Sequence, residues 1–313
     1  MTAKVFIDGA AGTTGLEIAE RLAGRPDIEI VTIAEARRKD PAARAEALNG
    51  ADAVVLCLPD DAAREAVSLI TNPDVRVVDA STAHRTAQGW AYGFAELDPG
   101  QREKLAEARR ISNPGCYPTG FLALVRPLVR VGLLPASTPL SVNAASGYSG
   151  GGKAMIAMYE DPASADATDS AFRAYALGLG HKHVPEMQRH AGLDHPPIFF
   201  PSVARTYRGM LVEVPLHLHL LPGRPSGAAL HDALAVAYDG SQIVRVHGDR
   251  PSALLIEQAA GTDRLDLYVY ADEKAGQARL VALLDNLGKG AAGAAVQNLN
   301  IALGLPEATG LRL

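Results

Sequence analysis

Cysteine is scarce in this sequence of 313 residues, and long hydrophobic runs are missing from it. The two cysteines, Cys57 and Cys116, are too few for a disulfide-rich secreted scaffold. No uninterrupted apolar run approaches the roughly 20 residues of a membrane-spanning helix. The N-terminal residues enter a strand-like run at once and lack the basic-then-apolar layout of a signal peptide. We therefore expect a soluble, cytoplasmic protein without a membrane partner.

Positive charge is also in short supply. The chain has 30 Lys and Arg against 35 Asp and Glu, a net charge of −5. Because phosphate contacts need a positive surface, this balance argues against a nucleic-acid partner. With 48% hydrophobic and 21% charged residues, the composition is that of a globular protein and excludes global disorder. The length favours two domains.

The hydrophobic pattern changes character along the chain. Up to about residue 117, short apolar runs alternate with helical patterns, and runs such as 53–58 are apolar throughout. This pattern is typical of a Rossmann-type, doubly wound parallel sheet in an α/β domain. Later strands are longer and closer together, which predicts an α+β domain with a largely antiparallel sheet. We expect a dinucleotide-binding domain at 1–117, a second domain at 118–285, and a C-terminal helix within 286–313 that packs back on the first.

The first strand leads directly into a glycine-rich loop. Gly9, Gly12 and Gly15 are spaced as Gly-x-x-Gly-x-x-Gly, with Thr13 and Thr14 at the start of the next helix. Glycines let the backbone approach a pyrophosphate, and a helix N-terminus supplies N–H donors for it. This context favours dinucleotide binding over a plain turn. The residues expected to line the same sheet edge are Leu58, Pro59 and Ser81.

A run of three cations, Arg37, Arg38 and Lys39, follows the second strand. Arginine at this point of a dinucleotide-binding fold holds the 2′-phosphate of NADP, whereas an acidic residue such as Glu35 holds the ribose of NAD. The run favours NADP, with Arg37 and Arg38 as its ligands. The alternative is a solvated charge run before Pro41.

Cys116 is the candidate nucleophile. It follows a short strand and a Pro-Gly turn and precedes a helix, whose N-terminus would favour the reactive thiolate. The alternative is a buried, inert cysteine, which describes Cys57 better because Cys57 lies within an apolar strand. A thiolate beside a nicotinamide predicts thioester chemistry, in which an acyl group is transferred to sulfur and reduced to an aldehyde.

Other polar residues suit supporting roles in that chemistry. His181 or His183 could exchange the thiol proton, and Asn113 with the Cys116 N–H could stabilise an oxyanion. The alternative for Asn113 is an Asx turn before Pro114. His181 and His183 could also suggest zinc, but only His190 is near enough to be a third ligand, so we expect no metal.

The leaving phosphate needs cations, for which Arg85 and Lys153 are candidates. Both flank loops of small residues, and both can equally be read as ordinary surface charge.

Four motifs together carry a family resemblance. The sequence resembles the N-acetyl-γ-glutamyl-phosphate reductase family of the aspartate-semialdehyde dehydrogenase-like superfamily in the segments 9–15, 113–119, 181–186 and 285–290. The resemblance implies an NADPH-dependent reduction of this acyl phosphate in arginine biosynthesis, through a cysteine thioester, by a homodimer or homotetramer. It also implies that one of the two histidines, for which we favour His181, is the acid–base group. Ser149 and Glu186 would contact the substrate, and Asn286 would either meet the nicotinamide or cap a helix.

The sequence departs from the family pattern at two places and leaves other functions open. An acidic residue frequent between Ser81 and Arg85 is absent, and Lys153 stands where arginine is frequent. A reductase of another acyl phosphate, such as aspartyl phosphate, or of an acylated carrier protein is an alternative from the same class. A non-catalytic dinucleotide sensor and a cysteine hydrolase are alternatives from other classes.

Overall fold

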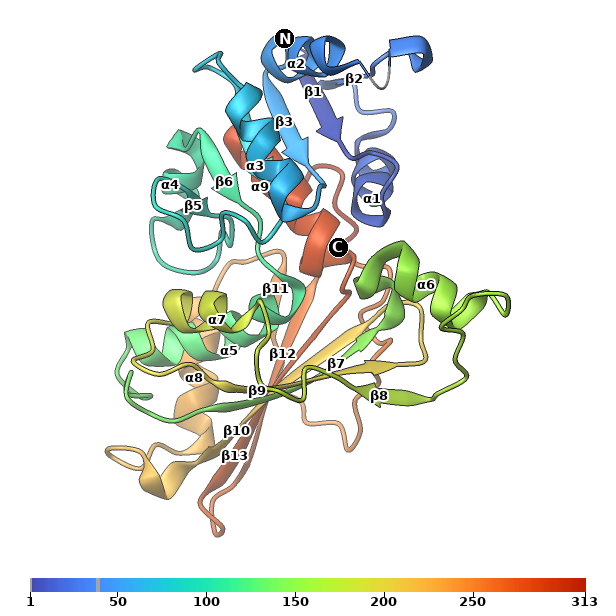
Figure 1. Ribbon diagram of the computed structural model, residues 1–313. Helices are drawn as coiled ribbons and strands as arrows, with labels where there is room; N and C mark the ends of the chain where they lie inside the picture. Colours follow the sequence, from blue (N-terminus) through green and yellow to red (C-terminus); the bar gives the residue numbers. More distant parts are fainter. Residues whose placement is uncertain (1, 38–39) are drawn as a thin grey trace. The chain divides into compact units, whose positions relative to one another are not determined.

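The chain divides into two compact units in the computed structural model, which describes residues 2–37 and 40–313 (Figure 1). The first unit comprises the residues up to Ala95, together with Gly100–Pro114 and Ala291–Leu311. The second unit comprises Glu96–Pro99, Gly115–Gly290 and Arg312–Leu313. The sequence placed the boundaries after residues 117 and 285, whereas the contacts divide the chain after residues 114 and 290.

The first unit is built on a parallel sheet. In the part of the chain that is described, six strands lie in the order β2-β1-β3-β4-β6-β5, and all their pairings are parallel. The central strand β3 consists of apolar residues that are all buried, as a strand covered on both faces requires. The bounds are β1 Ala3–Asp8, β2 Ile28–Val31, β3 Ala53–Leu56, β4 Arg76–Asp79, β5 Ala91–Tyr92 and β6 Arg110–Ser112.

Helices cover both faces of this sheet and bury two separate apolar clusters. One cluster joins β1 and β3 to α1, α4 and α9, and the other joins the same strands to α2 and α3. These three layers confirm the predicted doubly wound fold. The helix bounds are α1 Thr13–Leu22, α2 Pro41–Gly50, α3 Asp60–Leu69, α4 Gln101–Glu107 and α9 Gly293–Ala302. The α2 helix was not foreseen, although Asp40 caps it and Pro41 opens it.

The second unit is built on a mixed sheet that is mostly antiparallel. Its described strands lie in the order β11-β12-β13-β10-β7-β9-β8, and only the β11–β12 and β7–β9 pairs are parallel. The largely antiparallel sheet is therefore confirmed. The bounds are β7 Ser141–Gly147, β8 Phe172–Ala174, β9 Ile198–Ala204, β10 Met210–His217, β11 Val244–Val246, β12 Leu265–Asp272 and β13 Gln277–Leu284.

One face of this sheet is covered by helices. Helix α5 (Cys116–Arg130) packs on β10, β12 and β13, and α8 (Gly227–Ala237) packs on β11 and β12. Helix α7 (Val184–Ala191) packs in turn on α5. Strand β10 alternates buried residues with more exposed ones, so its second face lies on the side of the sheet opposite α5. Helix α6 (Gly152–Glu160) contacts mainly the short turn Tyr148–Gly151 that precedes it.

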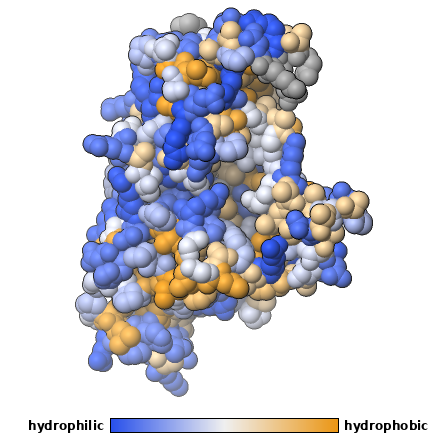
Figure 2. All heavy atoms as spheres, in the orientation of Figure 1, coloured by the Kyte–Doolittle hydropathy of each residue, from blue (hydrophilic) through white to orange (hydrophobic). Residues whose placement is uncertain are grey.

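The surface of the second unit is partly apolar. On the face drawn in Figure 2, its orange hydrophobic spheres form patches between blue hydrophilic ones. Phe172, Leu177 and Leu179 are among its large apolar side chains that are more than half exposed. None of the helices in the described chain combines the length and hydrophobicity needed to cross a membrane.

Candidate active site

The glycine loop of the first unit has a shape that only glycine permits. Gly9 has a φ of +92°, and a Cβ there would lie 2.4 Å from the main-chain oxygen of Cys57. A Cβ on Gly15 would lie 2.4 Å from the Gly9 oxygen. Gly12 is the residue before α1 and has no side chain that could cap the helix. The first main-chain N–H groups of α1, at Thr13 and Thr14, therefore receive no hydrogen bond from a capping side chain. The loop is therefore a cradle for an anion at a helix N-terminus.

The other residues predicted to bind the dinucleotide follow strands of the same sheet. Leu58 and Pro59 follow β3, and Pro59 is the residue before α3. Ser81 follows β4, where its hydroxyl donates to the buried carboxylate of Asp79 at 2.7 Å. Their contacts with a dinucleotide stay predictions.

Of the two arginines predicted to select NADP, one is described. Arg37 is half exposed and pairs with Asp40 at 3.0 Å and Glu46 at 3.1 Å, which raise the pKa of its guanidinium. Arg38 lies outside the described residues. The contact of Arg37 with a 2′-phosphate stays a prediction.

Arg85 and Asn113 are both buried in the first unit. The Arg85 guanidinium donates to the main-chain oxygens of Asn113 at 3.0 Å and Ala80 at 3.1 Å, and so joins the turns that follow β4 and β6. The Asn113 amide donates to the Ala291 oxygen at 3.0 Å and accepts from Asn298 at 2.9 Å. Both side chains thus hold backbone turns, and their predicted roles toward phosphate and oxyanion stay predictions.

Cys116 is the first residue of α5 and is partly exposed. The residue before it, Gly115, gives the helix no side-chain cap, so the thiol lies at the positive end of the helix dipole, which favours a thiolate. The Gly115 N–H donates to the carboxylate of Glu186 at 2.8 Å. Glu186 is buried in the first turn of α7, so it fixes the backbone next to the nucleophile. Its predicted contact with substrate stays a prediction.

A π-helical turn at Gly288–Ala292 packs against Cys116. A Cβ on Gly290 would lie 2.9 Å from the Cβ of Cys116, so no larger residue fits between the turn and the thiol. The neighbouring Lys289 is fully buried and pairs with the equally buried Glu96 at 2.8 Å. The pair thus ties the turn beside the nucleophile to the segment Glu96–Pro99.

His181 lies in an aromatic enclosure next to α5. Its ring meets those of Tyr117, Tyr175 and Phe199 edge to face, at centroid distances of 6.1, 5.7 and 5.1 Å. Burial, with a smaller effect from Lys182, lowers the pKa of His181 to about 4. The imidazole is therefore neutral at neutral pH.

The hydrogen bond to His181 also fixes which nitrogen carries the proton. The main-chain N–H of His183 donates to Nδ1 of His181 at 3.1 Å. A backbone N–H can only donate, so Nδ1 is the acceptor and the proton of the neutral ring is on Nε2. His183 itself is buried at the start of α7, with its ring 5.9 Å from that of Tyr117.

Two tyrosine hydroxyls join at the same place. Tyr175 donates to the hydroxyl of Tyr117 at 3.2 Å, and Tyr117 donates to the Ser202 oxygen at 3.2 Å. Burial raises the pKa of Tyr175 to about 12, and the charge of Cys116 adds to the rise. Both hydroxyls therefore stay protonated at neutral pH.

Asn286 and Ser149 lie in the second unit and contact each other. The Asn286 amide donates to the Ser149 hydroxyl at 2.9 Å and accepts from the Gly209 N–H at 2.9 Å. Asn286 thus joins the loop after β7 to the turn before β10, and its contact with the nicotinamide stays a prediction. Lys153 is exposed on α6, and its contact with phosphate also stays a prediction.

The other cysteine has a different environment. Cys57 follows β3, and burial raises the pKa of its thiol to about 12, with smaller effects from Asp79 and Asp8. It is therefore protonated and unreactive at neutral pH. Within residues 2–37 and 40–313, no three His, Cys, Asp or Glu side chains gather as a metal-binding group.

Sequence reasoning missed the residues that surround the predicted ones. Nothing in the local pattern links Tyr175 or Phe199 to His181, because Tyr175 follows β8 and Phe199 lies in β9. The 285–290 motif contained a usable signal: a lysine between two glycines at the end of an apolar strand is either exposed or paired. The structure pairs Lys289 with Glu96, which is 193 residues away.

Two family models match the chain. The model described as semialdehyde dehydrogenase, NAD binding domain, matches residues 4–108, and that described as semialdehyde dehydrogenase, dimerisation domain, matches residues 116–286. A solved structure of aspartate semialdehyde dehydrogenase II from Vibrio cholerae superposes with a TM-score of 0.71 at 15% identity, over 97% of this chain and 99% of that one. That likeness concerns the fold.

Curated relatives are much more similar in sequence. The N-acetyl-gamma-glutamyl-phosphate reductase of Trichormus variabilis is 54% identical over 98% of this chain and 99% of its own length. The protein of the same name from Brucella ovis is 55% identical over 97% of this chain and 100% of its own length. Identity at this level over the whole length shows the family. The chain belongs to the N-acetyl-gamma-glutamyl-phosphate reductases, within the semialdehyde dehydrogenase family.

Proposed function

We propose that this chain catalyses the NADPH-dependent reduction of N-acetyl-γ-glutamyl phosphate to N-acetylglutamate 5-semialdehyde and phosphate, a step of arginine biosynthesis. The observation that carries the proposal is Cys116 at the open N-terminus of α5, in a sequence that matches reductases of this name along its whole length. The enzyme is an oxidoreductase whose substrate is a small acyl phosphate.

The glycine cradle fits the pyrophosphate of a nicotinamide dinucleotide. Its backbone leaves no room for a Cβ at Gly9 or Gly15, and the first turn of α1 has no side-chain cap. When bound, NADPH supplies the hydride that turns an enzyme-bound thioester into an aldehyde. For NADP over NAD, the supporting residue is Arg37, whose present partners Asp40 and Glu46 are surface carboxylates that a 2′-phosphate can displace.

Cys116 forms and releases the covalent intermediate. Its thiolate attacks the acyl carbon, the bond from that carbon to the phosphate oxygen breaks, and phosphate leaves with the electron pair. The thioester is later resolved when the carbon–sulfur bond breaks and the thiolate returns. Glu186 fixes the backbone before Cys116 by accepting from the Gly115 N–H, and Gly290 lies so close to the Cys116 Cβ that no side chain fits between them.

His181 serves as a neutral hydrogen-bond donor in this scheme. With Nδ1 occupied by the His183 N–H, only Nε2–H can face a reacting oxygen. We assign it to the carbonyl oxygen of the acyl group, where a donor stabilises the negative charge that develops at each tetrahedral stage. When the carbon–sulfur bond breaks, the oxyanion re-forms the carbonyl of the aldehyde, so in this scheme the Nε2 proton stays on His181 and acts through its hydrogen bond. The thiolate is favoured by the helix dipole and does not depend on His181 as its base.

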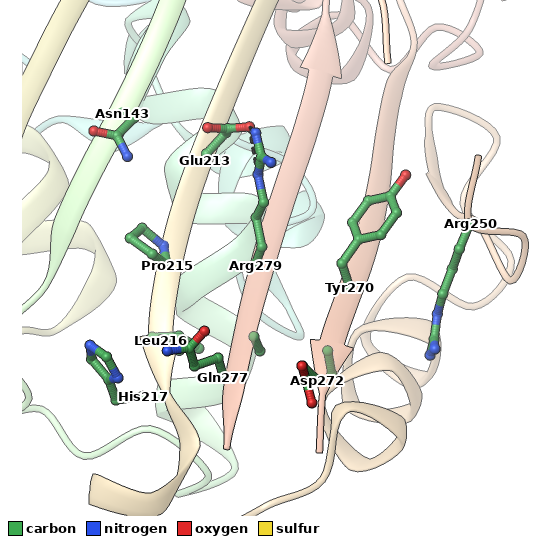
Figure 3. A pocket seen from close by; sticks show the side chains of 12 residues that line it. Asn143, Glu213, Pro215, Leu216, His217, Arg250, Tyr270, Asp272, Gln277 and Arg279 are labelled. Carbon is green, nitrogen blue, oxygen red and sulfur yellow. Dashed lines mark hydrogen bonds and ion pairs between the residues drawn. The ribbon is translucent and has the colours of Figure 1, made fainter. Parts of the chain in front are cut away.

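The part of the second sheet's other face, opposite α5, that residues 254–259 leave uncovered is our proposed dimer interface. Residues from β7, β10, β12 and β13 line a pocket of about 600 Å³ there, and Figure 3 shows Glu213 and Arg279 paired on the neighbouring strands β10 and β13. Ile198 and Phe200, on β9, are half exposed on the same face, since Phe200 lies opposite Asn143 in the register. An apolar face that also carries both signs of charge suits a self-complementary interface. The match of residues 116–286 to a dimerisation domain supports a homodimer, or a homotetramer built from it.

A reducing compartment follows from the chemistry. The nucleophile must stay a reduced thiol, and neither Cys57 nor Cys116 forms a disulfide bond in the described chain. We therefore place the enzyme in the cytoplasm.

A substrate panel tests the proposal. The purified protein should oxidise NADPH with N-acetyl-γ-glutamyl phosphate far faster than with aspartyl phosphate, and faster than it oxidises NADH. Cys116→Ala should abolish turnover and still bind NADPH, because the cradle belongs to the other unit. Near-normal turnover by this variant would refute the thioester mechanism, and a preference for aspartyl phosphate would refute the substrate.

A further inference from the structure

Arg208 occupies a rigid turn between β9 and β10. The main-chain N–H groups of Gly147, Tyr148 and Ser149 donate to oxygens of this turn at 2.8, 2.9 and 3.1 Å. Gly147 leaves no space for a Cβ, which would lie 2.7 Å from the Arg208 Cα. The backbone that carries Arg208 is therefore fixed against the end of β7.

A buried carboxylate orients the Arg208 side chain. Asp285 is fully buried and lies 3.4 Å from the Arg208 guanidinium. Its two oxygens also accept from the N–H groups of Leu287 at 2.8 Å and Gly261 at 2.6 Å, so the carboxylate is held in place. The guanidinium further lies 5.7 Å from the centre of the Tyr207 ring.

The same aspartate is hydrogen-bonded to the residue that packs against the nucleophile. The main-chain oxygen of Asp285 accepts from the Gly290 N–H at 3.0 Å, and Gly290 packs against the Cβ of Cys116. One short turn, 285–290, therefore holds the cation on one side and touches the nucleophile on the other. Asn286, within this turn, also binds Gly209, the residue after Arg208, at 2.9 Å.

We propose that Arg208 binds the phosphate group of the acyl-phosphate substrate beside Cys116. This assignment rests on the proposed function. It names a phosphate-binding residue that the sequence pattern did not single out, and it lies in the same unit as the thiol.

Two considerations favour phosphate over the other anionic group of the substrate. The phosphate is attached to the carbon that the sulfur attacks, whereas three carbons separate that carbon from the carboxylate, so a cation held by the turn that packs against Cys116 reaches the phosphate first. A guanidinium fork also matches the oxygens of phosphate, and its charge stabilises the leaving group as the bond breaks.

Alkylation of Cys116 tests the position of the charge without any reductase assay. Iodoacetate is an anion and iodoacetamide is neutral, and both alkylate the thiolate. In Arg208→Gln the ratio of the iodoacetate rate to the iodoacetamide rate should fall by about tenfold, the size expected when one unit charge that attracts the anionic reagent is removed. Arg208→Lys should keep most of the ratio.

A matched control removes a different positive charge from the same unit. Arg245 is exposed on β11, three strands away from β10 in the sheet, so Arg245→Gln should leave the ratio unchanged. An unchanged ratio in Arg208→Gln, with the iodoacetamide rate preserved, would overturn the proposal even if the protein is an active reductase.

Inorganic phosphate identifies the ligand. In the unmodified enzyme phosphate should protect Cys116 from iodoacetamide. In Arg208→Gln the concentration for half protection should rise at least tenfold, and in Arg208→Lys it should rise less. Unchanged protection in Arg208→Gln would overturn the proposal. In the reverse reaction the KM for phosphate should rise and the KM for the aldehyde should stay, and the opposite pattern would assign Arg208 to the carboxylate and refute this assignment.

Discussion

The buried ion pair between Lys289 and Glu96 gives the sharpest stability prediction. Both side chains are 2% exposed and their charged atoms lie 2.8 Å apart. Removing one partner leaves the other as an uncompensated buried charge, which costs about 3–5 kcal/mol. Lys289→Met and Glu96→Leu should each lower the free energy of unfolding by this amount. For a unit of this size the loss corresponds to a fall in Tm of roughly 6–20 °C.

The double variant distinguishes the interaction between Lys289 and Glu96 from the separate contribution of each side chain. When Lys289→Met and Glu96→Leu are combined, no buried charge remains and the volumes are nearly kept. The double variant should therefore be more stable than either single one, and within about 1–2 kcal/mol of the unmodified protein. Urea unfolding followed by circular dichroism measures all four proteins of this cycle. If the double variant lost the sum of the two single effects, the two residues would act independently and the reasoning would be refuted.

The pair should also matter for the nucleophile. Gly290 follows Lys289 and touches Cys116, so a single variant that loosens the π-helical turn should change the rate of Cys116 alkylation by iodoacetamide. In the double variant that rate should return toward its original value along with the stability. Alkylation rates that stay unchanged in both single variants would show that the turn holds its place without the pair.

Three further predictions concern the cradle, the residue before the nucleophile and the histidine. Gly9→Ala should weaken NADPH binding in a fluorescence titration by at least tenfold, because its Cβ meets the Cys57 oxygen, and unchanged affinity would contradict the cradle. Glu186→Ala should lower stability by about 1–3 kcal/mol and slow turnover by stranding the buried Gly115 N–H, while Glu186→Gln, which keeps an acceptor, should recover most of both. In an NMR titration His181 should stay neutral until the pH falls to about 4. Because the pKa of His181 is lowered in the folded state, the residue costs no stability above pH 6.5 and destabilises the fold progressively as the pH falls from 6.5 to 4. An NMR titration midpoint of His181 near pH 6.5 would refute its role as a neutral donor.

Local patterns predicted the parts of the fold that local forces decide. The buried strands of the first unit are continuous apolar runs, and the Gly9 loop sits between a strand and a helix, so the doubly wound fold could be read from spacing alone. The helix was expected to begin after Cys116, whereas α5 includes Cys116 as its first residue, because the helix begins directly after the Pro-Gly turn. The β13 strand was not foreseen, since its register with β10 and β12 depends on residues far apart in the chain.

The sequence by itself determined the chemistry on offer: a thiol at a helix start, a glycine cradle, and a histidine pair. Only the tertiary structure decided what those groups can do. The pKa and the tautomer of His181 come from burial among rings of distant strands and from one backbone N–H. The charge of Arg208 is oriented by Asp285, which lies far along the chain from it. The next residues of the two segments, Gly209 and Asn286, are 77 residues apart and are joined by a hydrogen bond. Protonation and orientation are set by the surrounding dielectric and by hydrogen-bond partners, and those surroundings exist only once distant segments have packed together.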